Sequence, residues 1–297
     1  MKTLIIGGSG KIGVNLIKNN NSFLYTYYSN KIKGGIKFDI AKDKISKIIK
    51  KYNIKSVIFL GAISDPNTCF KYKKFSKKIN VINTKKILEY LIKKKIYFIF
   101  FSSEFIFDGK KGNYKESDYS NPINEYGKQK LEIEKFIENK AEYYAIFRIS
   151  KTYGNNLADN TLISNYLKSL LQGKRKFNVA YDQKFNPLYV NDLKKILMIF
   201  LRYKKKGIYN LGGPQKLSRY QCLKKINLLL KNEVKRNISI KKLKLKKFKY
   251  LDKRPIDVTM NTKKLKKILN FKMSKFEIIA KKMIKKYKIN EKIFEAR

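Results

Sequence analysis

The 297-residue sequence contains no histidine and no tryptophan, and it contains only two cysteines, Cys69 and Cys222. Without histidine, any general acid must be a Tyr, Lys, Cys, Asp or Glu side chain, and no imidazole is available to bind a metal ion. Two cysteines supply neither a disulfide framework nor a cysteine metal cluster. We therefore expect no metal site and a reducing, cytoplasmic environment.

Long apolar runs are also missing. The apolar run near the start of the chain has only three residues, Leu4, Ile5 and Ile6, before the glycines begin, which is too short for the apolar core of a signal peptide. No stretch approaches the roughly 20 apolar residues that cross a bilayer. We expect a soluble protein with no membrane partner.

Acidic residues are few, since 22 Asp and Glu stand against 70 Lys and Arg, giving a formal net charge of +48. One interpretation is a surface for nucleic acid or acidic membranes. However, only seven of the basic residues are Arg, whose planar guanidinium grips phosphate best, and Lys is spread along the chain with a denser run only at residues 241–253. Lys, Asn, Ile, Tyr and Phe share AT-rich codons, so compositional drift explains the charge. We predict no specific nucleic-acid partner, although the field would attract small anionic ligands.

Hydrophobic residues make up 43% of the sequence, enough for a globular core. In the first half, short apolar runs alternate with amphipathic stretches of helical spacing. The predicted strands are residues 3–6, 23–28, 35–38, 56–60, 96–101 and 143–149, and the predicted helices begin near residue 11 and cover residues 45–52, 75–93 and 126–139. This alternation indicates βαβ units with right-handed crossovers, and hence an α/β protein with a doubly wound parallel sheet.

Glycines follow the first predicted strand directly, in the sequence GGSGKIG at residues 7–13. Gly7, Gly10 and Gly13 have a spacing that lets the backbone turn tightly and approach a pyrophosphate, which then lies at a helix N-terminus with Lys11 and Ile12. The spacing alone is weak, but a strand before it and a helix after it favour a Rossmann dinucleotide site. The alternative is an ordinary glycine-rich turn.

The end of the second predicted strand bears on the choice of cofactor. Sites that prefer NAD place Asp or Glu there to hold the ribose 2′-hydroxyl. This sequence instead has Ser29, Asn30 and Lys31, whose hydroxyl and cation suit a 2′-phosphate, so we predict NADP(H). The alternative is a solvated loop. Asp39 and Ile40 follow the third strand and are predicted to belong to the cofactor site. Asp39 could accept a hydrogen bond from the adenine amino group, or it could be a helix N-cap.

Tyr126 and Lys130 lie four residues apart on a predicted helix and therefore share one face. An adjacent ammonium would lower the pKa of the tyrosine, which could then pass a proton to a carbonyl. The Tyr-x-x-x-Lys pattern occurs four times in this Lys-rich chain, and only Tyr126 follows, by about one loop, the apolar strand that ends in Ser102 and Ser103. A chance surface pair is the alternative.

Beyond about residue 155 the alternation loosens. Residues 161–172, 218–231 and 276–288 have helical spacing, and residues 188–189 and 208–211 are predicted to return to the sheet. We predict an NADP-binding Rossmann domain in residues 1–155 and a smaller substrate-binding lobe in residues 156–297, with segments near residues 186–211 threading back into the first domain.

Four segments resemble one family. FFSSEFIFDGKKGNYKESDYSNPINEYGKQKLEIEKFI, NPLYVNDLKKIL, GIYNLGGPQKLSRYQ and RPIDVTMNTKKLKKIL are similar, in this order and over nearly the whole chain, to the dTDP-4-dehydrorhamnose reductase family, a branch of the extended short-chain dehydrogenases. Phe-Asp-Gly followed by Asn-Pro and then Tyr-x-x-x-Lys is quite specific. The Arg-Pro-x-Asp element is characteristic of this branch.

The resemblance implies NADPH-dependent reduction of the C4 keto group of a nucleotide-linked 6-deoxysugar, without a metal ion. By position, Ser103 would lie beside the substrate carbonyl and Tyr126 would donate the proton. Lys130 would hold the nicotinamide ribose and lower the pKa of Tyr126. On the same basis Gly61 and Ala62 would pack against the adenosine ribose. The implied substrate residues are Ser103, Glu104, Asp182, Gln183 and Arg254.

Some features depart from the family. Glu104 stands where Asp is common, and the fourth strand ends in Leu-Gly-Ala rather than Asn-Ala-Ala. The segment from Gly61 is more like general nucleotide-sugar reductases and epimerases, so an epimerase or dehydratase is an alternative. The regulatory subunit of methionine adenosyltransferase shares the motifs and gives a non-catalytic alternative. Reductases of this kind often form homodimers.

Overall fold

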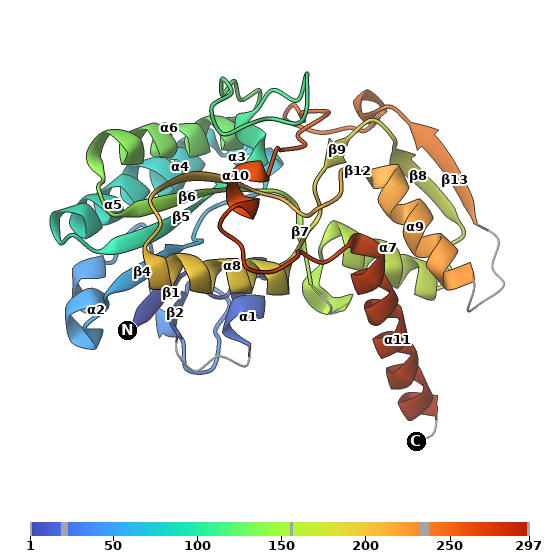
Figure 1. The fold of residues 1–297 in the computed structure, drawn as a ribbon, viewed down its shortest axis with the longest axis horizontal. Helices are drawn as coiled ribbons and strands as arrows, with labels where there is room; N and C mark the ends of the chain where they lie inside the picture. Colours follow the sequence, from blue (N-terminus) through green and yellow to red (C-terminus); the bar gives the residue numbers. More distant parts are fainter. Residues whose placement is uncertain (1, 19–22, 155–156, 232–237, 296–297) are drawn as a thin grey trace.

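A seven-stranded parallel sheet lies at the centre of the computed structural model, which describes residues 2–18, 23–154, 157–231 and 238–295 (Figure 1). The strand order is β11-β6-β5-β4-β1-β2-β3. The seven strands are β1 (Thr3–Ile6), β2 (Phe23–Tyr27), β3 (Ile36–Lys37), β4 (Ser56–Phe59), β5 (Tyr97–Ser103), β6 (Tyr144–Ile149) and β11 (Gly207–Leu211). The predicted doubly wound parallel sheet is confirmed, because the strand order reverses at β1.

Helices cover both faces of the sheet (Figure 1). On one face, α2 (Ile45–Tyr52), α5 (Thr84–Lys93) and α6 (Glu125–Lys140) pack against Leu4 and Ile6 of β1. On the other, α1 (Lys11–Ile17), α8 (Val190–Tyr203) and α10 (Lys263–Lys266) pack against Ile5. Successive side chains of a strand point to opposite faces, so these continuous apolar strands fill two cores at once.

The predicted helix over residues 75–93 is longer and less regular than its pattern suggests. After α3 (Pro66–Lys71), α4 covers Lys73–Lys77, a π-helix covers Lys78–Asn83, and α5 continues to Lys93. A π-helix is rare and is often found at functional sites. It changes which side chains of this stretch face the sheet.

A third core lies in the second half of the chain. It joins α7 (Leu162–Leu171), α9 (Arg219–Lys231) and α11 (Phe276–Glu295) to three short pairs of strands. These pairs are β7 (Thr152–Tyr153) with β10 (Leu188–Tyr189), β9 (Lys184–Phe185) with β12 (Leu217–Ser218), and β8 (Lys176–Ala180) with β13 (Ser239–Leu243). Phe105 and Tyr126 from the first half also pack against this core.

One prediction for this half needs correction, and one helix was not predicted. Leu188–Tyr189 does not return to the central sheet, because it pairs with β7 in a separate two-stranded ladder, whereas Gly207–Leu211 pairs with β6. The helix α8 between them was not predicted, although Leu193, Ile196, Leu197 and Phe200 have helical spacing. Among the described residues, no helix is long and apolar enough to span a bilayer.

Candidate active site

A cavity of about 420 Å³ opens at the carboxyl ends of β1, β2 and β4. In a parallel sheet of this kind, ligands bind at the carboxyl ends of the strands near the point where the strand order reverses. The predicted cofactor residues that line this cavity are Gly7, Gly10, Asp39, Ile40, Gly61 and Ala62.

Close backbone packing explains two of the glycines. Gly7 has φ +87°, and a Cβ added there would lie 2.8 Å from the Gly61 nitrogen. A Cβ on Gly13 would lie 2.4 Å from the Gly8 oxygen, so α1 packs directly on the turn that precedes it. Only glycine fits at these positions, and the turn lies against the end of β4 as a dinucleotide-binding turn requires.

The residues predicted to hold a 2′-phosphate are not among those that line this cavity. Ser29, Asn30 and Lys31 are exposed and do not line the cavity; instead Tyr27, Tyr28 and Lys42 do. Two lysines line the cavity, Lys42 from the loop after β3 and Lys78 from the π-helix. The sequence analysis singled out neither of these lysines, although Lys42 stands only three residues after Asp39.

Two further predictions for this region have definite outcomes. Lys11 donates from Nζ to the Asn160 carbonyl at 2.9 Å, and neither Lys11, Ile12 nor Gly13 lines the cavity. Asp39 Oδ1 accepts from the Ala41 backbone N–H at 2.7 Å and thereby stabilises its own loop. The N-cap alternative for Asp39 is wrong for the helix that follows, because Lys44 occupies the N-cap of α2.

Ser103, Tyr126 and Lys130 meet where β5 ends and α6 begins. Ser103 is the last residue of β5, and its hydroxyl accepts from the Phe105 N–H at 3.2 Å and hydrogen-bonds the Tyr126 side chain. The Asn124 side chain caps α6 by accepting from the Gly127 N–H at 2.8 Å. A Cβ on Gly127 would lie 2.1 Å from the Phe105 oxygen, so glycine lets α6 approach the end of β5.

Burial controls the protonation of this group. Burial raises the pKa of Tyr126 well above its usual value, and the hydrogen bond from Ser103 offsets only part of this effect. Burial also lowers the pKa of Lys130 to about 8. The Lys130 ammonium donates to the Phe101 carbonyl at 2.8 Å and lies 5.8 Å from the centre of the Tyr126 ring. The structure therefore shows a raised Tyr126 pKa where a lowered one was expected, and burial is the main cause.

A buried hydrogen-bond network, which we call the Asn80–Gln129 link, joins the cavity to α6. Asn80, in the π-helix, accepts from the Ile63 N–H at 2.8 Å and donates to the Ile63 carbonyl at 2.9 Å and to Gln129 Oε1 at 2.8 Å. Gln129 Nε2 donates to Ser76 Oγ at 2.9 Å. Ile63 lines the cavity and Gln129 precedes Lys130, so the link connects the two parts of the site.

The predicted substrate residues are only partly brought together. Arg254 donates to Asn67 Oδ1 at 2.8 Å and is almost buried. Gln183 is fully buried and holds the Pro255 carbonyl at 3.1 Å, so it supports the Arg254 segment from behind. Asp182 instead accepts from the Leu245 N–H at 2.8 Å, which ties down a neighbouring loop.

Two cations that the sequence reasoning did not single out lie near Glu104. Lys151 Nζ lies 3.6 Å from Glu104 Oε1, and Arg219 donates from Nε to the Gln183 side chain. The charges of Arg219 and Arg254 both lower the pKa of Lys151, so these three cations lie near one another. In a chain with 63 lysines, no sequence signal distinguishes Lys151.

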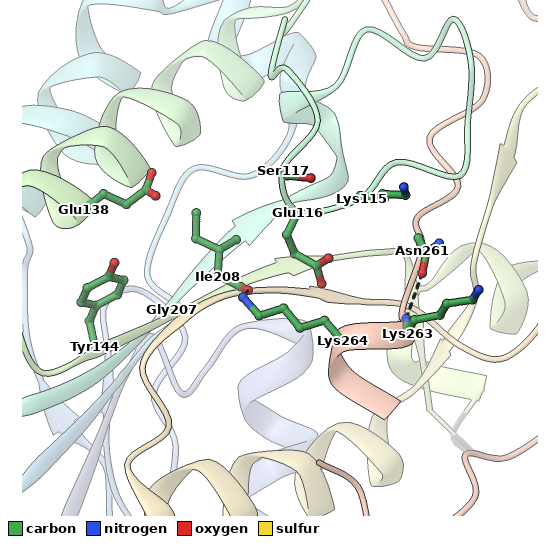
Figure 2. Close-up of a pocket in the computed structure, with 10 residues that line it drawn as sticks. All are labelled: Lys115, Glu116, Ser117, Glu138, Tyr144, Gly207, Ile208, Asn261, Lys263 and Lys264. Atoms are coloured by element: carbon green, nitrogen blue, oxygen red, sulfur yellow. Dashed lines mark hydrogen bonds between the residues drawn. The ribbon is translucent and has the colours of Figure 1, made fainter. Parts of the chain in front are cut away.

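A second cavity, of about 580 Å³, lies at the opposite ends of the strands (Figure 2). It is bordered by Tyr144 and Gly207, the first residues of β6 and β11. Figure 2 shows Lys264 reaching the Ile208 carbonyl, to which it donates at 2.8 Å. Its lysines are exposed, and it is separate from the Ser103 group.

These observations define a class, the dinucleotide-binding α/β proteins of the reductase and epimerase type. Within that class, the chain belongs to the RmlD substrate binding domain family, whose sequence model matches residues 1–289. The family membership confirms the resemblance to dTDP-4-dehydrorhamnose reductases.

Similar curated proteins differ in kind. The chain is 24% identical over 184 residues to methionine adenosyltransferase 2 subunit beta of Xenopus tropicalis, covering 60% of this chain and 55% of that protein. It is 27% identical over 186 residues to the dTDP-4-dehydrorhamnose reductase of Aggregatibacter actinomycetemcomitans, covering 60% of this chain and 62% of that protein. The chain thus matches less than two thirds of the length of each.

Solved structures are similar over almost the whole fold. A hypothetical dTDP-4-dehydrorhamnose reductase from Sulfolobus tokodaii is 28% identical, with a TM-score of 0.79 over 93% of this chain and 98% of that one. The dTDP-4-dehydrorhamnose reductase of Bacillus anthracis, solved in complex with NADP, is 19% identical, with a TM-score of 0.82 over 96% and 99%. The second likeness concerns the fold alone.

Proposed function

We propose that the chain is a reductase that uses NADPH to reduce the 4-keto group of a nucleotide-linked 6-deoxysugar. The observation that carries this proposal is the meeting of Ser103, Tyr126 and Lys130 at the end of β5, which the Asn80–Gln129 link joins to the glycine-lined cavity. In the same proposal, residues 1–155 hold the cofactor and residues 156–297 supply the lobe over the sugar.

The glycine-lined cavity fits a nicotinamide dinucleotide. A side chain at Gly7 would collide with the backbone of Gly61, and one at Gly61 would collide with the Ile40 side chain, so glycine at both positions leaves main chain that a pyrophosphate can approach closely. Asp39 and Ile40 would border the adenine, and Gly61 and Ala62 the adenosine ribose. We favour NADP(H) because no acid follows β2 at residues 28–31 and Lys42 lies at the rim.

Bound NADPH would supply a hydride to the keto carbon. Tyr126 then donates its phenolic proton to the carbonyl oxygen, while Ser103 donates a hydrogen bond to the same oxygen. Lys130 would hold the ribose and compensate the phenolate as the proton leaves. The raised pKa of Tyr126 keeps the proton on the phenol until the oxygen becomes basic.

The anionic part of the substrate fits the cations of the second half. Arg219 and Arg254 lie close enough to Lys151 for their charges to lower its pKa. A nucleoside diphosphate carries two phosphates, and guanidinium groups bind them in a planar, bidentate way. Gln183 contacts both Arg219 and Pro255, and it thereby fixes the position of the Arg219 segment relative to the Arg254 segment.

Oxidation of NADPH, followed by its near-ultraviolet absorbance, tests the proposal with a dTDP-4-keto-6-deoxysugar as substrate. We expect turnover by the wild type and a loss of about 10²–10⁴-fold in Tyr126→Phe, the usual contribution of a general acid. Tyr90→Phe is the matched control, because Tyr90 begins another Tyr-x-x-x-Lys pattern, on α5. No turnover by a wild type that binds NADPH would refute the reductase.

The second candidate is a non-catalytic nucleotide-binding subunit, favoured by the likeness to methionine adenosyltransferase 2 subunit beta. That outcome would appear as NADPH binding, by fluorescence, that is insensitive to Tyr126→Phe and leads to no reduction. An epimerase, the other alternative, would convert one nucleotide-sugar to another without net NADPH oxidation. A homodimer stays a prediction that light scattering would test.

A further inference from the structure

The second cavity, at the amino ends of β6 and β11, has no part in the proposed function. Its volume is about 580 Å³, and it is bordered by Tyr144 and Gly207, the first residues of the two strands. The other end of β6 is Ile149, which pairs with Ser103. At about 3.3 Å per residue along β6, the second cavity lies roughly 16 Å from the proposed reacting group. A ligand bound here would therefore occupy a separate site.

Charged side chains of both signs line this cavity without pairing with one another. Figure 2 shows Lys115 and Lys263 on one side of the cavity and Glu138 and Tyr144 on the other. Within the described part of the chain, Lys115, Lys263 and Glu138 take part in no ion pair. Because the sequence has 70 basic residues and 22 acidic ones, a shortage of cations does not explain the unpaired Glu138. The cavity thus presents separate positive and negative sides.

Backbone hydrogen bonds hold the positive side in place. The Asn261 N–H donates to the Tyr114 carbonyl at 2.7 Å, which keeps the segment that carries Lys263 beside the loop that carries Lys115. In the same loop, Glu116 Oε1 accepts from a backbone N–H of β11 at 2.9 Å, so the loop is also attached to the sheet. Two lysines held on one side of a cavity suit a phosphate monoester, which carries about two negative charges at neutral pH.

The negative side suits neutral hydroxyl groups. The charge of Glu138 raises the pKa of Tyr144, so the two side chains are close together, and neither has a hydrogen-bond partner among the described residues. A carboxylate accepts hydrogen bonds and a phenol both donates and accepts them, which matches the hydroxyls of a sugar. An ammonium would fit less well, because Lys206 Nζ already lies 5.8 Å from the centre of the Tyr144 ring and like charges repel.

We propose that the second cavity binds a sugar phosphate, with the phosphate at Lys115 and Lys263 and the sugar hydroxyls at Glu138 and Tyr144. This inference is independent of the proposed reductase function. Inorganic phosphate would satisfy the lysines but leave the opposite side without a partner. A nucleic-acid strand would bring its phosphates against Glu116 and Glu138, and a metal ion would meet three lysines in the same cavity. A sugar phosphate satisfies both sides at once.

Calorimetric titration of the full chain with glucose 6-phosphate, mannose 6-phosphate, ribose 5-phosphate and inorganic phosphate tests the proposal. An ionic strength of about 0.15 M screens the general attraction of a basic protein for anions. We expect at least one sugar phosphate to bind about fivefold or more tightly than inorganic phosphate. The double variant Lys115→Met, Lys263→Met should bind that sugar phosphate about 20-fold more weakly. Glu138→Gln should bind it about fivefold more weakly, yet bind inorganic phosphate as tightly as the wild type or more tightly, because a repelling charge is removed.

Matched controls test whether an effect comes from the cavity. Lys266→Met changes a lysine of α10 that does not line it, and Glu89→Gln changes an exposed glutamate on α5; both should bind as the wild type does. If none of the three sugar phosphates binds, or if the double variant binds them unchanged, the proposal is overturned. Equal affinity for inorganic phosphate would reduce the cavity to an anion-binding surface and also overturn it. Binding that is lost in Arg254→Met but kept in the double variant would lie in the proposed substrate site instead.

Discussion

Gly127 allows the sharpest test of how α6 is placed. A Cβ there would lie 2.1 Å from the Phe105 backbone oxygen and 2.9 Å from a Pro122 side-chain atom. Because the first contact is with backbone, the clash cannot be relieved by turning a side chain. In an open helix Gly→Ala stabilises by about 1 kcal/mol, but here we expect Gly127→Ala to lower the free energy of unfolding by about 2–3 kcal/mol.

Gly127→Ala should also lower the activity of the protein that remains folded. Relief of the clash requires α6 to move away from the end of β5, and both Tyr126 and Lys130 would move with it relative to Ser103. A displacement of about 1 Å at reacting groups can cost about 10²-fold in rate. We therefore expect a loss of this size in kcat under conditions where the variant is still folded.

Urea unfolding and steady-state kinetics measure the two effects. Gly173→Ala is the control, since a Cβ at Gly173 meets nothing within 4 Å and only its φ of +83° opposes a side chain. That variant should lose about 1–2 kcal/mol of stability and keep its kcat. A Gly127→Ala protein as stable and as active as the wild type would show that α6 is not held by this contact.

Two further predictions concern buried charges. The pKa of Lys130 is lowered from 10.5 to about 8, so between about pH 8 and 10.5 the unfolded chain binds the extra proton and the native state gains stability as pH rises. The free energy of unfolding, measured with urea, should therefore rise from pH 7.5 to 10.5 by up to about 3 kcal/mol more in the wild type than in Lys130→Met. If the difference between the two proteins does not change with pH, the burial of a charged amine is contradicted. Glu134→Ala leaves Arg148 buried without its 2.8 Å partner and should cost about 3–5 kcal/mol, whereas breaking the more exposed Lys85–Glu132 pair should cost less than about 1 kcal/mol; similar losses would refute the role of burial.

The fold and the first part of the site could be predicted because they depend on local patterns. Apolar strands that fill two faces, and glycines between a strand and a helix, are visible in a single sequence. Gly7 and Gly61 lie together because the carboxyl ends of β1 and β4 are neighbours, which follows from the strand order. The position of Tyr126 after Ser103 follows from the same parallel arrangement.

Other features depend on packing that no local pattern contains. The raised pKa of Tyr126 reflects its burial, and this side chain packs against the core of the second half of the chain. Ser29, Asn30 and Lys31 have suitable chemistry, yet the path of their loop keeps them outside the cavity. The two-residue strand Leu188–Tyr189 is too short for periodicity to assign its partner.

The Asn80–Gln129 link has a consequence for recombining this protein with its relatives. Asn80 contacts Ile63 and Gln129 at once, so the segment after β4 and α6 should be exchanged together. A chimera that takes residues 56–93 from a relative but keeps this α6 brings in a partner for Gln129 that was not fitted to it. Grafts should therefore carry both segments together. The unit that can be exchanged is defined by contacts between segments that lie far apart in the sequence, not by one continuous stretch of chain.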